Sequence, residues 1–354
     1  MAAVSLTRHL FLDVAPGETR GVVLVNGRPE RLLISRDGDP TPRLGARYLG
    51  RVVASSSRMG LARIDIGLGG EPGPAASLKL SGADAPSDGA TVEVEVTAEP
   101  ARGKGANVSL IRIAPTGRPG MTAPPPSVRD RLLTLEPDTP IVEGDRARDV
   151  ADDAQTEALA REHVHSGGLT LTIESTRALV AVDVDVGERA GSDAKRVTRA
   201  ANFAALTLAA RVLRLKGEGG LVVIDLAGRG HDGPAMISGA RLAFGPDNPG
   251  VAFGPISRFG TLELTVPRRR RSLAERLLGP DGQPTALTLA LRLIRQIERE
   301  AQADPGAQLE IRAAPDVAEA AAPYLSALTD RFGGRLALVA DAARARGDND
   351  IKAR

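Results

Sequence analysis

The sequence predicts an α/β fold (α+β overall), and three observations support this class. The N-terminal third contains short apolar runs separated by Gly, Pro, Ser and Asp, which is typical of antiparallel strands. Between residues 180 and 226, a strand pattern, a long amphipathic helix pattern and a uniformly apolar strand pattern follow one another, as in a βαβ unit. Helix and strand patterns alternate again from residue 285 to 340. The length of 354 residues predicts two or three domains.

The composition excludes several classes of protein. The chain has no cysteine, so disulfides, thiol catalysis and cysteine-based zinc sites are ruled out. The net charge is only +2, so an anion-binding site must be a local patch. Since no run of about 18 apolar residues and no secretory leader pattern is present, we expect a cytoplasmic protein with no membrane partner.

The pattern of the first part of the chain predicts β-structure. Residues 1–40 form an N-terminal β segment, in which Asn26-Gly27 between two apolar runs predicts a hairpin. Further strands are expected at Tyr48–Val53, Leu61–Ile66, Thr91–Thr97 and Val108–Ile113. Their spacing predicts a small barrel or sandwich over residues 41–113, with the OB-fold as one candidate.

Residues 114–166 are predicted to be a linker followed by a helix. The stretch Ala114–Ser127 is rich in Pro and Gly, which is the composition of a linker. Val150–Glu162 is rich in Ala and mixed in charge, as in a solvated amphipathic helix.

Residues 167–272 contain the clearest pattern in the chain. Strand patterns at Leu169–Glu174 and Ala178–Val184 precede a long helix, Ser192–Lys216, for which Ser192 is a suitable N-cap. The apolar run Leu221–Leu226 is then expected to pair in parallel with the strand before the helix, through a right-handed crossover.

Residues 273–354 are expected to form a small α/β C-terminal domain. Its elements are predicted at Thr285–Ala303, Ala307–Ala313, Val317–Phe332 and Arg335–Ala340, alternately helix and strand. The polar tail from Asp341 is expected to fray.

Three carboxylates stand where a parallel sheet places its ligands. Asp183 and Asp185 are two residues apart and face one way in an extended chain, and Asp225 ends an apolar strand. Both strands would end at the edge where α/β sheets bind ligands. Two or three converging carboxylates would suit a divalent cation, above all magnesium. The alternative is that Asp185 begins a turn and Asp225 caps a loop.

Two basic segments could bind an anion. In the segment Arg102-Gly-Lys104-Gly, glycine lets the backbone approach a phosphate and Lys104 supplies charge, although such a loop is often only a turn. The run Arg268, Arg269, Arg270 and Arg271 could grip a nucleic-acid backbone or be a solvated charged surface. His163 and His165 lack zinc spacing and are expected at the surface.

The segment Ser166–Asp185 resembles the catalytic core of the ribonuclease E/G family. The similarity continues through Gly191–Asp193, Asn202, Arg211–Leu215, Gly219–Asp225, Ile256–Gly260 and Ala290–Ile294. Upstream, Gly45–Arg51 and Lys104–Ala106 are similar to the embedded OB-fold RNA-binding domain of that family.

The resemblance implies a magnesium-dependent endoribonuclease that cleaves single-stranded RNA. It implies a DNase I-like βαβ catalytic core, with Asp183 and Asp225 as the metal ligands and Asp185 as a third catalytic position, where the family has Asn. Lys104 and Arg102 would contact RNA in the OB domain. Arg258, by family match, and Arg268, Arg269 and Arg270, by their own charge, are expected to contact RNA as well.

Departures from the family pattern leave alternatives open. Arg63 stands where an aromatic side chain is expected, and residues 114–166 are too few for a full RNase H-like lobe with a 5′-monophosphate pocket. The cysteines of the zinc link are missing, so any homo-oligomer would form without it. The second hypothesis is an RNA-binding relative with impaired catalysis, and the third is a scaffold that only keeps the fold.

Overall fold

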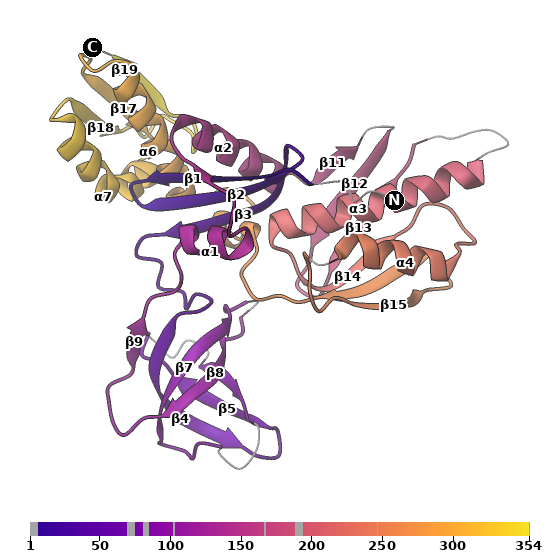
Figure 1. The fold of residues 1–354 in the computed structure, drawn as a ribbon. Helices are drawn as coiled ribbons and strands as arrows, with labels where there is room; N and C mark the ends of the chain where they lie inside the picture. The colour runs from indigo at the N-terminus through magenta and orange to yellow at the C-terminus, as the bar shows by residue number, and fades with distance from the viewer. Residues whose placement is uncertain are drawn as a thin grey trace.

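The computed structural model describes residues 6–68, 75–80, 85–101, 103–165, 168–187, 194–245 and 247–353. Within these residues the strands form four sheets, arranged as an N-terminal sheet, a barrel, a core sheet and a small C-terminal sheet. In Figure 1 the barrel hangs below the N-terminal sheet, while the core and the C-terminal part lie on opposite sides of it. No helix in the described part of the chain is long and apolar enough to cross a membrane.

The N-terminal sheet has a helix on each face. Its strands are β1 (Arg8–Ala15), β2 (Glu18–Val25), β3 (Arg28–Arg36) and β10 (Ile141–Val142), in the order β10-β1-β2-β3. The predicted hairpin is confirmed, since Asn26 and Gly27 both have positive φ, of 51° and 77°. Side chains of one face pack on α2 (Asp145–Leu159), and those of the other face pack on α1 (Val128–Leu135). The segment after the barrel therefore returns to complete this domain.

The predicted barrel is present and OB-like. Its strands are β4 (Arg47–Ser56), β5 (Leu61–Asp65), β6 (Ala76–Lys79), β7 (Thr91–Ala98) and β8 (Asn107–Ile113). Pairing between β4 and β5 closes the barrel. A further strand, β9 (Gly120–Ala123), pairs with β4 inside the stretch expected to be a linker. A Pro-rich composition does not exclude a short strand at a sheet edge, where one row of backbone groups needs no partner.

The core sheet has its helices on one face. Its strands are β11 (Glu162–His165), β12 (Leu169–Ser175), β13 (Val180–Asp185), β14 (Gly220–Asp225), β16 (Thr261–Val266) and β15 (Ala252–Ile256), in this spatial order. The predicted parallel pair β13–β14 is confirmed, with α3 (Ala194–Lys216) as the crossover. The proposed N-cap Ser192 lies outside the described residues. A second helix, α4 (Gly233–Phe244), packs closely on α3. The absence of a side chain at Gly239 allows this approach, since a Cβ there would overlap the Phe203 ring.

The C-terminal part contains α5 (Leu273–Leu277), α6 (Ala286–Ala303), β17 (Leu309–Ala313), α7 (Pro315–Phe332), β18 (Leu336–Ala340) and β19 (Asp350–Ala353). The expected fraying of the tail from Asp341 is wrong, since β19 pairs with β17. Ile351 packs on the apolar cluster of this domain, and Arg344 donates to Asp350 at 3.0 Å. Ion pairing therefore orders a tail whose composition is polar.

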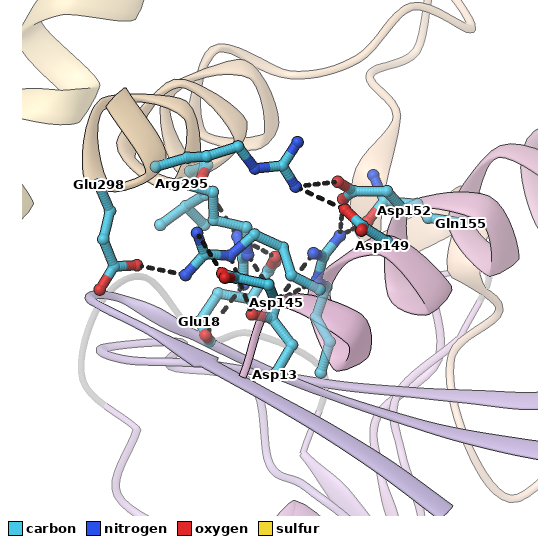
Figure 2. A network of polar contacts seen from close by, with 12 residues as sticks. Asp13, Glu18, Asp145, Asp149, Asp152, Gln155, Arg295 and Glu298 are labelled. Atoms are coloured by element: carbon cyan, nitrogen blue, oxygen red, sulfur yellow. Dashed lines mark hydrogen bonds and ion pairs between the residues drawn. The ribbon is translucent and has the colours of Figure 1, made fainter. Parts of the chain in front are cut away.

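A buried network of charged side chains joins the N-terminal sheet to the C-terminal helix α6 (Figure 2). Asp13 on β1 is 3% exposed and accepts hydrogen bonds from Arg20 and Arg295, each at 2.8 Å. Arg148 on α2 donates to Glu298 on α6 at 2.8 Å. Burial alone would raise the pKa of the Asp13 carboxyl, but the guanidinium groups of Arg295 and Arg20 hold it below its usual value.

The first prediction concerns this network. Asp13→Asn removes the buried carboxylate that Arg20 and Arg295 share and leaves them only Asp152 and Glu18 as countercharges. We therefore expect unfolding to become easier by about 3 kcal/mol, measured by urea denaturation. As a control, Asp316→Asn removes an exposed partner of Arg346 and should cost less than about 1 kcal/mol. Equal losses in the two variants would contradict this account of the network.

Candidate active site at the carboxyl edge of the core sheet

Asp183 and Asp225 lie side by side on neighbouring strands. The register of the parallel pair aligns Val182 with Ile224 and Asp183 with Asp225. The alternating apolar side chains of both strands are buried against the helices, in the core cluster that contains Val182 and Ile224. Because side chains alternate between the faces of a strand, the two aspartates lie on the opposite face, where they are exposed.

Neither carboxylate has a protein partner among the described residues. Two like charges directly adjacent in a sheet repel each other, so this pair destabilises the sheet unless a cation lies between them. The arrangement is thus suited to binding a cation rather than to holding the fold together.

Asp185 is placed differently. Its Oδ1 accepts the backbone N–H of Gly187 at 2.8 Å, so it begins the turn after β13, as the alternative interpretation proposed. The described residues contain no group of three or more His, Asp or Glu side chains placed to hold a metal. Magnesium is commonly held by one or two carboxylates, with waters and substrate phosphates as the other ligands, and the Asp183–Asp225 pair fits that requirement.

Asn202 on α3 fixes the backbone just beyond Asp225. Its side chain is 1% exposed, donates to the carbonyl of Ala227 at 3.0 Å and accepts the N–H of Ala227 at 3.0 Å. The two hydrogen bonds join the helix to the loop that follows β14. Sequence reasoning assigned no role to Asn202, and the available signal was a lone amide on the apolar face of a helix.

The β15–β16 turn brings Arg258 to the same edge. Thr261, which follows the turn, is directly opposite Asp225 in the antiparallel β14–β16 pair. The Arg258 guanidinium lies 4.6 Å from the centroid of the Phe259 ring. Gly260 has a φ of +96°, and a Cβ there would approach Nε2 of His231 to 3.3 Å, so the turn packs on the loop after β14.

Lys104 lies elsewhere, in a cleft of about 1460 Å³ between the barrel and the segment around α5. Basic side chains outnumber acidic ones in its lining, and the basic ones are Arg63, Lys104, Arg118, Arg177, Arg268 and Arg271. The side chains of Arg63, Lys104, Arg118 and Arg177 make no hydrogen bond or ion pair within the described ranges. Arg102, also predicted to contact RNA, lies outside those ranges.

Most of the arginine run 268–271 is engaged in contacts within the protein. Arg268 pairs with Glu275, and Arg271 donates to Thr41 at 3.0 Å. Burial lowers the pKa of Arg270, with Glu99 nearby acting in the opposite direction. Arg269 alone of the four is exposed, so most of this run is not a free surface for RNA.

The cleft and the aspartates lie at opposite ends of β13. The cleft includes the β12–β13 turn at Ser175–Arg177, and Ser175 pairs with Val180, the first residue of β13. Asp183 is three residues further, about 10 Å along the strand. The structure therefore brings Asp183, Asp225 and Arg258 to one edge and Lys104 to the other.

The expectation that His163 lies at the surface is wrong. Its side chain pairs across from Leu171 on the helix-covered face of the sheet and is 5% exposed. Burial, followed by the nearby charge of Lys216, lowers the pKa of His163 to about 4. Lys216 itself donates to the carbonyls of Ala158 and Ala160 and so caps the end of α2.

A family model and several known proteins match the part of the chain that contains this site. The model of the Ribonuclease E/G family matches residues 130–271, which include all three aspartates. Ribonuclease E of Escherichia coli (strain K12) is 32% identical over 154 residues, 41% of this chain and 14% of that protein. Ribonuclease E of Buchnera aphidicola (subsp. Acyrthosiphon pisum, strain APS) is 33% identical over 147 residues, 38% of this chain and 16% of that protein. Ribonuclease G of Escherichia coli (strain K12) is 26% identical over 182 residues, 49% of this chain and 37% of that protein.

These matches confirm the predicted resemblance to the ribonuclease E/G family over this region. The chain spans between about a seventh and just over a third of the length of these relatives.

The second prediction concerns His163. Because the folded state keeps this imidazole neutral down to about pH 4, unfolding takes up a proton between pH 6.5 and 4, and stability is lost as the pH falls through that window. We expect a loss of about 2 kcal/mol between pH 7 and pH 5 from this group, measured by urea denaturation at both values. His163→Gln should remove that loss. His9→Gln, at an exposed position, should keep it.

Proposed function

We propose that the chain is a magnesium-dependent endoribonuclease that cleaves single-stranded RNA at the edge carrying Asp183 and Asp225. The observation that carries the proposal is the pair of adjacent, exposed and unpartnered carboxylates, within the region that matches the Ribonuclease E/G family. The relatives are named as ribonucleases, which points to RNA as the substrate class. The assignment of the core to a DNase I-like fold is part of this proposal.

Each residue at the edge has a defined task in this proposal. Asp183 and Asp225 would hold the ion, which when bound neutralises phosphate charge and lowers the pKa of a bound water. Asn202 is a positioning residue, because it holds the backbone two residues beyond Asp225. Arg258 supplies a positive charge for the phosphodiester backbone.

The cleft at the other end of β13 would hold the RNA. Its unpaired basic side chains from the barrel and from the β12–β13 turn offer contacts to successive phosphates. A single strand bound there and at the Asp183–Asp225 edge would follow β13 over about 10 Å.

The alternative is an RNA-binding relative without catalysis, and two observations favour it. Asp185 carries an extra negative charge where the resembled family has Asn, and its carboxylate is already bonded to Gly187. Arg63 replaces the aromatic residue expected in the barrel. The alternative predicts RNA binding without cleavage.

The third prediction tests catalysis. The purified chain should cleave a fluorescently labelled, AU-rich single-stranded RNA in magnesium and stop when the ion is chelated. Asp183→Asn and Asp225→Asn should each slow cleavage at least about 100-fold, because each removes half of the ion's protein ligands. Asp316→Asn, far from the edge in sequence and fold, should cut like the wild type.

Equal rates in wild type and Asp183→Asn would refute the proposed metal site. Binding without cutting would support the alternative, with Asp185→Asn as the variant that should restore cleavage.

The fourth prediction tests the cleft. A double variant, Lys104→Ala with Arg177→Ala, removes two phosphate contacts and should weaken RNA binding. The slope of log affinity against log salt should become shallower by about 1.4, since each phosphate contact on a single strand contributes about 0.7. Fluorescence anisotropy between 50 and 300 mM KCl measures both quantities. Lys352→Ala removes a lysine paired with Asp350 in the C-terminal part and should leave the slope unchanged.

A further inference from the structure

One aromatic side chain differs from the others in its exposure to solvent. The protein has only six Phe, two Tyr and no Trp. Seven of these eight rings are buried or half-buried, whereas Phe259 is 77% exposed. The exposed ring therefore offers a flat apolar surface to a ligand, and burying it on binding is favourable.

The turn that carries Phe259 is fixed by hydrogen bonds. The Ser257 hydroxyl accepts the backbone N–H of Phe259 and of Thr261, each at 3.2 Å. The N–H of Ser257 donates to the carbonyl of Thr261 at 2.9 Å, and that of Gly260 donates to the carbonyl of Ser257 at 3.0 Å. The ring is therefore presented on a bonded turn rather than on a loose loop.

This turn lies next to the Asp183–Asp225 pair. Thr261 and Asp225 are directly opposite each other, with Cα atoms about 5 Å apart in such a pair. Phe259 is two residues earlier, so its Cα lies within about 12 Å of that of Asp225. That distance is the span of three or four stacked bases at about 3.4 Å each.

Arg258 adds a flat cation to the ring. Its guanidinium lies 4.6 Å from the centroid of the Phe259 ring and makes no hydrogen bond or ion pair in the described part of the chain. Aromatic rings and guanidinium planes are the two surfaces on which proteins stack unpaired nucleobases. The guanidinium can also donate to a phosphate while it remains stacked.

We propose that Phe259 and Arg258 bind a nucleobase of the RNA within a few nucleotides of the scissile phosphate. The inference rests on the proposed function and names a binding contact for it. The Phe259 ring stacks on the base. The Arg258 guanidinium stays stacked on the Phe259 ring and contacts the phosphate backbone of the RNA. Such a contact would supply base stacking at the catalytic edge, in a chain whose barrel has Arg63 where an aromatic residue is expected.

The absence of tryptophan allows a direct test. Phe259→Trp gives a chain with a single indole, whose fluorescence a stacked base quenches. The probe is a single-stranded RNA decamer in chelator, compared with a decamer of equal charge whose central positions are abasic. We expect quenching by the first and at least twofold less by the second at saturation. Leu242→Trp, at an 84% exposed position on α4, is the control and should not distinguish the two decamers.

A second variant gives an independent measure. Phe259→Ala should weaken binding of the normal decamer by about 5- to 150-fold, which is the measured range for loss of one base–aromatic stack. Its affinity for the abasic decamer should change little. Its circular dichroism should match that of the wild type, since the Ser257 hydrogen bonds that hold the turn are kept.

The outcomes separate this inference from the function beneath it. Wild-type affinity in Phe259→Ala together with unquenched Phe259→Trp would overturn the stacking role, while aspartate-dependent cleavage would still support the enzyme. A failure of the wild-type chain to bind the decamer would overturn both. If Phe259→Ala changes only the sedimentation coefficient, the ring docks a protein surface and the nucleobase assignment is wrong.

Discussion

The register between β13 and β14 determines that the two aspartates of the candidate site lie side by side. Val182 and Ile224 are neighbours in the buried face of the sheet, and this pairing holds Asp183 beside Asp225 on the open face. A slip of one residue in either strand would turn its aspartate toward the core and its apolar side chains toward water. The hydrophobic contacts under α3 therefore hold together two carboxylates that repel each other.

Ion pairs join the other parts of the chain to one another. Asp13 binds arginines from β2 and from α6, which ties the C-terminal helix to the N-terminal sheet. Glu99, directly after β7 of the barrel, accepts a hydrogen bond from Arg276 of α5 at 2.8 Å. Buried ion pairs of this kind add less net stability than apolar contacts but set a specific geometry, which here places the basic cleft against one end of β13.

The sequence predicts those elements that depend on residues close together in the chain. The Asn26-Gly27 turn and the crossover through α3 depend on neighbouring residues, and both are confirmed. The burial of His163, the strand β19 and the bond from Asn202 to Ala227 depend on partners far along the chain, which no local period encodes. Parallel topology predicted that Asp183 and Asp225 would lie at the same edge of the sheet. Their direct opposition depends on the strand register, which the topology does not fix. The separation of Lys104 from this pair was not predictable, because it depends on how the barrel is attached.

The central claim is that Asp183 and Asp225 together bind one divalent ion. Crystals of the chain soaked in manganese, with diffraction data collected at its absorption edge, test this without any assay of RNA. We predict one strong anomalous peak between the two carboxylates, about 2.1 Å from an oxygen of each. A map from well-diffracting soaked crystals with no peak there, or with the only peak at other carboxylates, would contradict it.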